Sequence, residues 1–413
     1  MRRSAVRHLL ARSQQSFWLV PTGCVVLAVI LAFGLPQADV HADLHVLFPG
    51  GPESARSFLS SITTAMISVT GLVFSITIVA LQLAAGQFSS RVMRDFLRDR
   101  VIQSTFGVFV GTFAYTMVLA RSVRGVSGGS DVFVPQLAVT AAFVLVLGSV
   151  AVFIIYINHI ANAIRVANIV DRIGAHGHTA LNAVPSPPDN AGDLHAPTGS
   201  PNRVVACPRG KVVVSINEGA LVRCAASTDA VFALVPRIGD FVPEGAPLFT
   251  LHGDGPCDDE LLQSVAFDTE RSYEQDIGFA FRALVDIAER ALSPGTNDPT
   301  TAAQAIDVLH DLLRTVATRP PPPWHRVDES GALRLVVPTY DFAELLQLAV
   351  QEIAHYGAED IQTPRRLTQM LRDLHTVALP SYQTAIERWR DVVREAPNSD
   401  RRPTMGVWTV GRA

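Results

Sequence analysis

Four long apolar segments without a charged residue dominate the first 165 residues of the chain. They cover residues 17–35, 58–85, 101–120 and 133–160. A helix needs about 20 predominantly apolar residues to cross a bilayer, and each segment reaches or nearly reaches that length. The pattern therefore predicts an α-helical integral membrane protein whose four spans form a transmembrane domain over residues 1–173.

The loops between these segments differ in arginine content, and this difference predicts their orientation. Ten arginines lie before the first span, between the second and third, and after the fourth, whereas the two other loops contain three. Cytoplasmic loops carry the excess of basic residues, so we expect both termini in the cytoplasm and the spans in a bacterial inner membrane. The first apolar run has 19 residues. It is longer than the core of a usual signal peptide, so we expect it to remain as a span.

The pattern changes after the fourth span. Residues 174–202 are rich in Gly and Pro without periodicity, which predicts a linker. In residues 203–255 short apolar runs predict a small β module, with Val212, Val214 and Ile216 on the inner side of a half-buried strand. Residues 256–395 have helical periodicity, and residues 396–413 are expected to form a loose tail. Together these segments predict a cytoplasmic α+β domain.

Two turns of the β module resemble those of barrel-sandwich hybrid domains, the fold of biotinyl and lipoyl carriers. They are residues 239–242 and residues 245–248. On this resemblance we expect a small β-barrel-like module. A carrier needs a lysine on an exposed hairpin, whereas the single lysine of the chain, Lys211, follows a glycine at the start of the module. The module is therefore expected to serve as structure or as a contact for a small ligand.

The helical region begins with an apolar stripe over residues 276–292, which predicts a first helix. Asp298 as an N-cap and Pro299 at the first helical position predict a second helix that runs to about residue 317. A strand is expected at residues 333–337. Two final helices are expected at residues 341–356 and 365–394.

Composition narrows the class of protein. Only 17% of the residues are charged and the net charge is -4, whereas soluble domains carry about 25% charged residues. These values exclude a disordered chain and argue against a nucleic-acid partner. The four cysteines lack zinc-site spacing, and the common nucleotide-binding, hydrolase and metalloprotease motifs are missing from the sequence. We therefore assign no catalytic residue, metal or cofactor, and expect no enzyme.

The second apolar segment carries small polar residues at three-, four- and seven-residue steps. Polar groups on a spanning helix must face protein or water rather than lipid. Two interpretations stay open: the line packs against another helix, or it borders a pore or solute path. Its residues are Ser61, Thr64, Ser68, Gly71, Ser75 and Gln82, and a second line beside it consists of Thr63, Thr70 and Thr77.

A polar cluster ends the fourth apolar segment. Asn158, Asn162 and Arg165 share one helical face, with His159 beside them. At the membrane interface such residues reach water at little cost. Deeper in the membrane they would indicate function, and His159 could then gate a path or relay protons because histidine titrates near neutral pH.

A third candidate lies in the helical region, around the turn between its first two helices. One interpretation is a helix corner in which every residue is explained by capping. The other is a cation site or a coupling contact to the membrane domain that uses Asn297 and Asp298 with the upstream Asp286 or Asp276. The residues are Asp276, Asp286, Arg290, Ser293, Pro294, Gly295, Asn297, Asp298 and Pro299.

Several of these motifs together resemble a bacterial membrane family known as domain of unknown function 2254. The motifs are residues 68–77, 87–91, 157–161, 276–279 and 286–299, and the resemblance extends over roughly residues 15–395. It implies a multi-spanning inner-membrane protein with a cytoplasmic C-terminal region and implies no activity. The Pro- and Gly-rich segment at 185–202 departs from the family pattern, which leaves the linker geometry open.

Two functional hypotheses from different classes follow. The first is a homo-oligomeric channel or transport-like protein, in which the second span borders a path and the cytoplasmic domain gates it. The second is a membrane-anchored ligand sensor or scaffold. In both, the lipid bilayer is a partner, and a small ligand or ion stays unidentified.

Overall fold

The computed structural model describes residues 18–39, 50–87, 99–123, 133–184, 197, 199–253, 255 and 258–395, with the backbone alone for 83–87. The chain divides into two compact units, Met1–Arg165 and Val166–Ala413. Each unit has its own apolar core and is described by itself.

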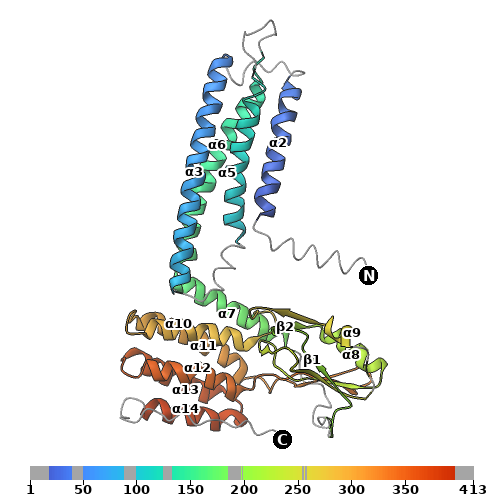
Figure 1. The fold of residues 1–413 in the computed structure, drawn as a ribbon. Coiled ribbons are helices and arrows are strands. Elements are labelled where there is room, and N and C mark those ends of the chain that lie inside the picture. The colour runs from blue at the N-terminus through green and yellow to red at the C-terminus, as the bar shows by residue number, and fades with distance from the viewer. Residues whose placement is uncertain are drawn as a thin grey trace. The chain divides into compact units, whose positions relative to one another are not determined.

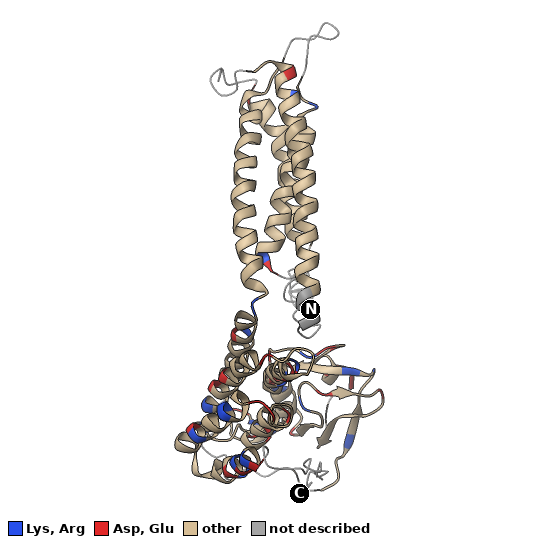
Figure 2. Ribbon diagram, turned by 90° about the vertical axis from the view of Figure 1, so that its left-hand side faces the viewer, with Lys and Arg blue, Asp and Glu red and all other residues tan. Residues whose placement is uncertain are grey.

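The first unit contains four long helices, labelled in Figure 1. All four are long and apolar enough to cross a membrane. Figure 2 shows that Lys, Arg, Asp and Glu occur only near their ends. These helices cover most of each of the four segments predicted as spans. Their bounds are α2 (Leu19–Asp39), α3 (Pro52–Gln87), α5 (Arg100–Leu119) and α6 (Gln136–Ala163).

Helix α5 is the central helix of this unit. Of its most apolar stretch 56% is buried inside the protein, against 22% for each of the other three helices. Gly107 brings α5 close to α2, since a Cβ at that position would lie 2.7 Å from the Cys24 Sγ. Large apolar side chains such as Phe33 and Ile154 are 60% and 65% exposed, as expected where helices face lipid.

The second unit stacks its helices in layers, visible in the lower part of Figure 1. Helix α7 packs on α10 and α11, these pack on α12 and α13, and α14 covers the last pair. Their apolar stripes face each other, so Phe281, Leu312 and Leu346 are fully buried. The bounds are α7 (Val166–Ala183), α10 (Ile277–Leu292), α11 (Pro299–Ala317), α12 (Phe342–Tyr356), α13 (Gln362–Val377) and α14 (Gln383–Glu395).

Two predictions about these helices are wrong. The linker predicted from residue 174 begins with helix, because Gly174 and Gly177 belong to α7 and allow it to approach α11 rather than marking a loop. The helix predicted over 365–394 is broken by a 3₁₀ turn, η2 (Pro380–Tyr382), since proline cannot continue a helix that arrives from before it.

The strands form two open sheets. The five-stranded sheet has the order β1-β5-β3-β8-β7, and the three-stranded sheet has the order β4-β2-β6. Two short helices, α8 (Glu218–Ser227) and α9 (Asp258–Leu262), lie in the same stretch of the chain as the first six strands. The strands are β1 (Arg203–Ala206), β2 (Lys211–Ile216), β3 (Val231–Leu234), β4 (Phe241–Val242), β5 (Pro247–His252), β6 (Val265–Asp268), β7 (His325–Val327) and β8 (Leu333–Val336).

The predicted barrel-like module is therefore not supported. Strand β3 pairs in parallel with β8, which comes from the helical region about 100 residues later in the chain. The larger sheet then ends at β1 and β7 and the smaller at β4 and β6, so neither closes on itself. The turns that resembled a barrel-sandwich hybrid are local, and the later strand decides the topology.

Strand β2 also differs from the predicted alternation. Val212 and Val213 are both buried, whereas Val214 is half-buried. The pairing of β2 with β6 shifts between Val213 and Ser215, which is a bulge. A bulge turns consecutive side chains toward one side, so a period of two does not hold across it.

Candidate functional site

The threonine line of α3 faces the interior of the first unit and joins it to the neighbouring helices. Thr63 Oγ1 lies 3.0 Å from Thr116 Oγ1 on α5, and Thr77 Oγ1 lies 2.6 Å from the Tyr156 hydroxyl on α6. Thr70 donates to the Met66 carbonyl at 2.6 Å. Buried hydroxyls need partners where water is excluded, so this line serves helix packing.

The other polar line of α3 lies on the outer surface of the same unit. The hydroxyls of Ser61, Thr64 and Ser68 donate to carbonyls four residues earlier in α3 itself, at 2.9, 3.0 and 3.1 Å. A Cβ added at Gly71 would meet no atom within 4 Å. All six residues of the line are exposed: Ser61, Thr64, Ser68, Gly71, Ser75 and Gln82.

The polar cluster at the end of α6 gains a partner that sequence reasoning missed. Asp99 accepts from the Val101 backbone at 2.8 Å as the N-cap of α5, and its other oxygen lies 2.7 Å from His159 Nε2. In the sequence Asp99 lies among the charged residues of the loop, two positions before the apolar segment 101–120, so nothing there indicates a role. The pair joins α5 to α6. Asn162 donates to the Asn158 carbonyl at 2.9 Å, and Arg165 is exposed.

In the second unit Asp276 holds the start of α10. Its carboxylate accepts from Phe279 N at 3.0 Å, and Arg271 binds both of its oxygens at 2.7 and 2.9 Å. Burial raises the pKa of Asp276, and the hydrogen bonds and charge of Arg271 act against that effect. The carboxylate is thus a structural anchor of α10 rather than an open ligand.

Residues 291–299 form the corner between α10 and α11. Ser293 Oγ donates to the Arg290 carbonyl at 2.7 Å, and Asp298 N donates to the Ala291 carbonyl at 2.8 Å. Asn297 takes a left-handed φ of 46°. Asp298 then caps α11 through Thr301, whose hydroxyl lowers the pKa of that carboxyl. Pro294 and Gly295 are exposed, and Pro299 is the first residue of α11.

Asp286 belongs to a charged cluster on α10 and α12. Arg282 Nε donates to Asp286 at 2.5 Å, and its Nη2 donates to Glu289 at 3.0 Å. The Nη1 atom donates to Glu352 on α12. Sequence reasoning named only Asp286, because nothing in the local pattern brings Glu352 next to α10.

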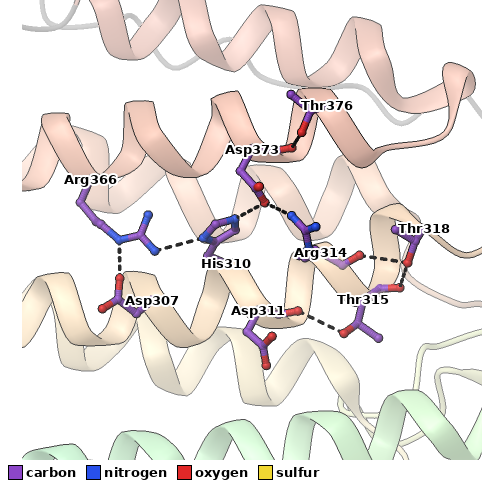
Figure 3. A network of polar contacts seen from close by, with 9 residues as sticks. All are labelled: Asp307, His310, Asp311, Arg314, Thr315, Thr318, Arg366, Asp373 and Thr376. Carbon is purple, nitrogen blue, oxygen red and sulfur yellow. Dashed lines mark hydrogen bonds and ion pairs between the residues drawn. The ribbon is translucent and has the colours of Figure 1, made fainter.

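A second charged network joins α11 to α13, as Figure 3 shows. His310 Nε2 lies 2.8 Å from Asp373 Oδ2, while Arg366 Nη2 lies 3.0 Å from His310 Nδ1. Arg314 also binds Asp373, and Arg366 binds Asp307. Two arginines match two aspartates here, so the charges of these four groups balance. The sequence held no signal for it, since its residues are about 60 positions apart.

His325 is a buried imidazole without a hydrogen-bond partner among the described residues. It lies in β7, is 4% exposed, and Trp324 packs edge-on against it at 4.8 Å between ring centroids. Burial lowers its pKa, and the charge of Arg326 adds to the effect. Below about pH 6.5 the unfolded chain therefore binds a proton at this residue more readily than the folded chain does. The contribution of His325 to stability falls as pH drops.

We expect His325→Phe to stabilise the protein by about 1 kcal/mol at pH 8, because an unpaired buried polar group is removed. The gain should be larger at pH 5.5, where the wild-type histidine favours the unfolded state. Denaturant unfolding of the purified protein at both pH values measures it. His355→Phe at an exposed position is the matched control, and an equal gain there would contradict the explanation.

Comparison with known proteins shows to which family the chain belongs. A family model described as a predicted membrane protein (DUF2254) matches residues 14–373. The chain belongs to this family. Uncharacterised proteins of Mycobacterium bovis and Mycobacterium tuberculosis are each 31% identical to it over 430 residues, covering 98% of this chain and 81% of theirs. No solved structure matches the chain. The resemblance drawn from the motifs is confirmed, and the family description, a predicted membrane protein, agrees with the four candidate spans.

The candidate residues do not converge on one site. The outer line of α3 and the pair Asp99–His159 belong to the first unit, and the charged clusters belong to the second. Within the described residues, no group of three or more His, Cys, Asp or Glu side chains is arranged to hold a metal ion. The outer line of α3 is the feature best suited to a function in a membrane, because its polar residues face outward from the unit.

Proposed function

We propose that this protein is a homo-oligomeric channel or transport-like protein of the bacterial inner membrane, in which α3 of each copy borders a shared solute path. The observation that carries this proposal is the exposure of the outer α3 line on a single copy. Polar residues in a spanning helix avoid lipid. A neighbouring copy or a water-filled path is therefore the expected surrounding of this line.

The spacing of the line supports assembly through α3. Ser61, Ser68, Ser75 and Gln82 follow one another at seven-residue steps, the repeat that keeps one seam facing a partner helix. Exposed Ser54 and Ser57 continue the same seam toward the start of α3. Small side chains allow helix backbones to approach closely. Near a symmetry axis the same hydroxyls could instead line a narrow uncharged path.

The second unit is proposed to assemble and gate the path, and the positive-inside pattern favours a cytoplasmic position for it. Two residues separate its first helix, α7, from the end of α6. Gly174 faces Val308 and Gly177 faces Leu312, so α7 is packed closely against α11. Any displacement of α11 would therefore reach the fourth span through a junction of two residues.

Disulfide cross-linking in membranes tests the assembly. We expect Ser68→Cys and Ser75→Cys, each in a background with the four native cysteines replaced, to form cross-linked dimers on mild oxidation. Ile67→Cys is the matched control, because Ile67 is 56% exposed but lies on a different side of α3. Equal cross-linking at positions 67 and 68 would contradict a specific seam.

Flux measurements test the activity. Protein reconstituted in liposomes should pass small ions, and Ser68→Phe should reduce the flux severalfold while Ile67→Phe leaves it unchanged. Monomeric particles without flux would refute the proposal. Ligand-dependent stabilisation of the same preparation would then favour a membrane-anchored sensor.

A further inference from the structure

The charged cluster of Arg282 has more carboxylates than its single guanidinium can neutralise. Each of the three guanidinium nitrogens binds a different carboxylate, those of Asp286, Glu289 and Glu352. With every group ionised, the cluster carries two negative charges in excess. The comparable network on α11 and α13 has two arginines for two aspartates and carries no such excess.

Glu289 and Glu352 are the two carboxylates that meet across this contact. They bind the two terminal nitrogens of the same guanidinium, and they come from different helices. The Glu289 side chain is 23% exposed and Arg282 is 28% exposed, so water screens their charges only in part. Two carboxylates this close repel each other when both are ionised, and they attract each other when they share a proton.

The neighbouring helices do not supply the missing positive charge through the contacts described. On α11, Asp307, His310 and Arg314 bind residues of α13, and Asp311 binds His178 of α7. His176 of α7 stacks on Tyr273. On α12, Glu344 binds Arg237. The groups whose charges act on Glu289 are Glu352, Arg282 and Asp286, and Arg290 lies next to it on α10.

We propose that the α10–α12 contact is a proton-operated latch, closed while Glu289 and Glu352 share one proton and loosened when that proton leaves. This proposal goes beyond the proposed channel function and does not depend on it. One of the two helices of the latch, α10, also packs against α7, since Ala280 of α10 borders Gly177. The state of the latch therefore affects the support of α7 within the second unit.

The direction of the effect follows from the environment of Glu289. Burial and the neighbouring Glu352 raise its pKa from 4.5 to about 7. Once α10 and α12 separate, the carboxyl returns to its ordinary value, so the closed state binds the proton more tightly. The closed state is favoured fully below pH 4.5, and this advantage is lost as pH rises to about 7. The equilibrium constant for opening should increase by up to roughly 70-fold between pH 5 and pH 8.

Hydrogen exchange of the full-length protein in detergent tests the latch. In the wild type, exchange of the α12 amides, corrected for the intrinsic effect of pH, should rise tens of times between pH 5 and pH 8. Glu289→Gln keeps a neutral hydrogen-bonding group and should abolish the rise. Glu352→Gln should reduce the rise, because it removes the neighbouring charge while the burial of Glu289 remains. Glu359→Gln removes an exposed carboxylate from the turn after α12 and should leave the rise intact.

Several outcomes would overturn the proposal. One is that the pH dependence is unchanged in both Glu289→Gln and Glu352→Gln. Another is loss of the pH dependence in Glu359→Gln, which would indicate a general effect of surface charge. Restored protection of the wild type at pH 8 on addition of Mg²⁺ or Ca²⁺ would show that a cation, rather than a proton, balances the cluster.

Discussion

Gly239→Ala should destabilise the second unit by about 3 kcal/mol or more, the largest effect expected from a single methyl group in this protein. Gly239 has a φ of 101°, which an alanine adopts only with strain. Its added Cβ would also lie 2.0 Å from Asp276 Oδ2 and 2.9 Å from Arg271 Nε. The carboxylate cannot move away freely, because it caps α10 and is 2% exposed.

A second glycine with a positive φ separates the cost of backbone strain from the cost of the clash with Asp276. Gly245 has a φ of 79°, but a Cβ there would meet no atom within 4 Å. Gly245→Ala should therefore cost only the backbone strain, about 1 kcal/mol. Denaturant unfolding of both variants, followed by helical circular dichroism, measures the difference. Equal losses would show that the buried Arg271–Asp276 pair tolerates displacement.

Gly177→Leu should detach α7 from the helix stack. A Cβ at this position would lie 2.9 Å from both methyl carbons of Leu312 and 3.3 Å from the Ala280 Cβ, so a leucine cannot fit without moving α7. Overpacking of this kind costs about 1–3 kcal/mol. The expected result is faster hydrogen exchange across residues 166–183, with the exchange of α12 and α13 unchanged.

Ala175→Leu is the control for this variant, because residue 175 is exposed on the same helix. It should leave exchange of α7 as in the wild type. Unchanged exchange in Gly177→Leu would contradict close packing of α7 on α10 and α11. If the channel function holds, the same variant should also alter flux in liposomes, since the gate would lose its attachment to the fourth span.

The spans and several helix ends were predictable because their causes are local. A run of uncharged apolar residues is sufficient to define each long helix of the first unit, independently of its neighbours. Asp276, Asp298 and Asp341 cap helices through hydrogen bonds to residues three positions later. The family motifs are likewise contained within the sequence itself.

Only the tertiary structure decided features whose partners are distant in the chain. The predicted barrel fails because β3 pairs with β8, and Asp99 gains its role from His159, 60 residues away. The outer face of α3 and the inner face share the same residue types, and only packing against α5 and α6 distinguishes them. The sequence by itself determined the elements governed by short-range hydrogen bonding and by hydrophobic length. Which charges meet, as Glu289 and Glu352 do across two helices, depends on contacts that no local pattern contains.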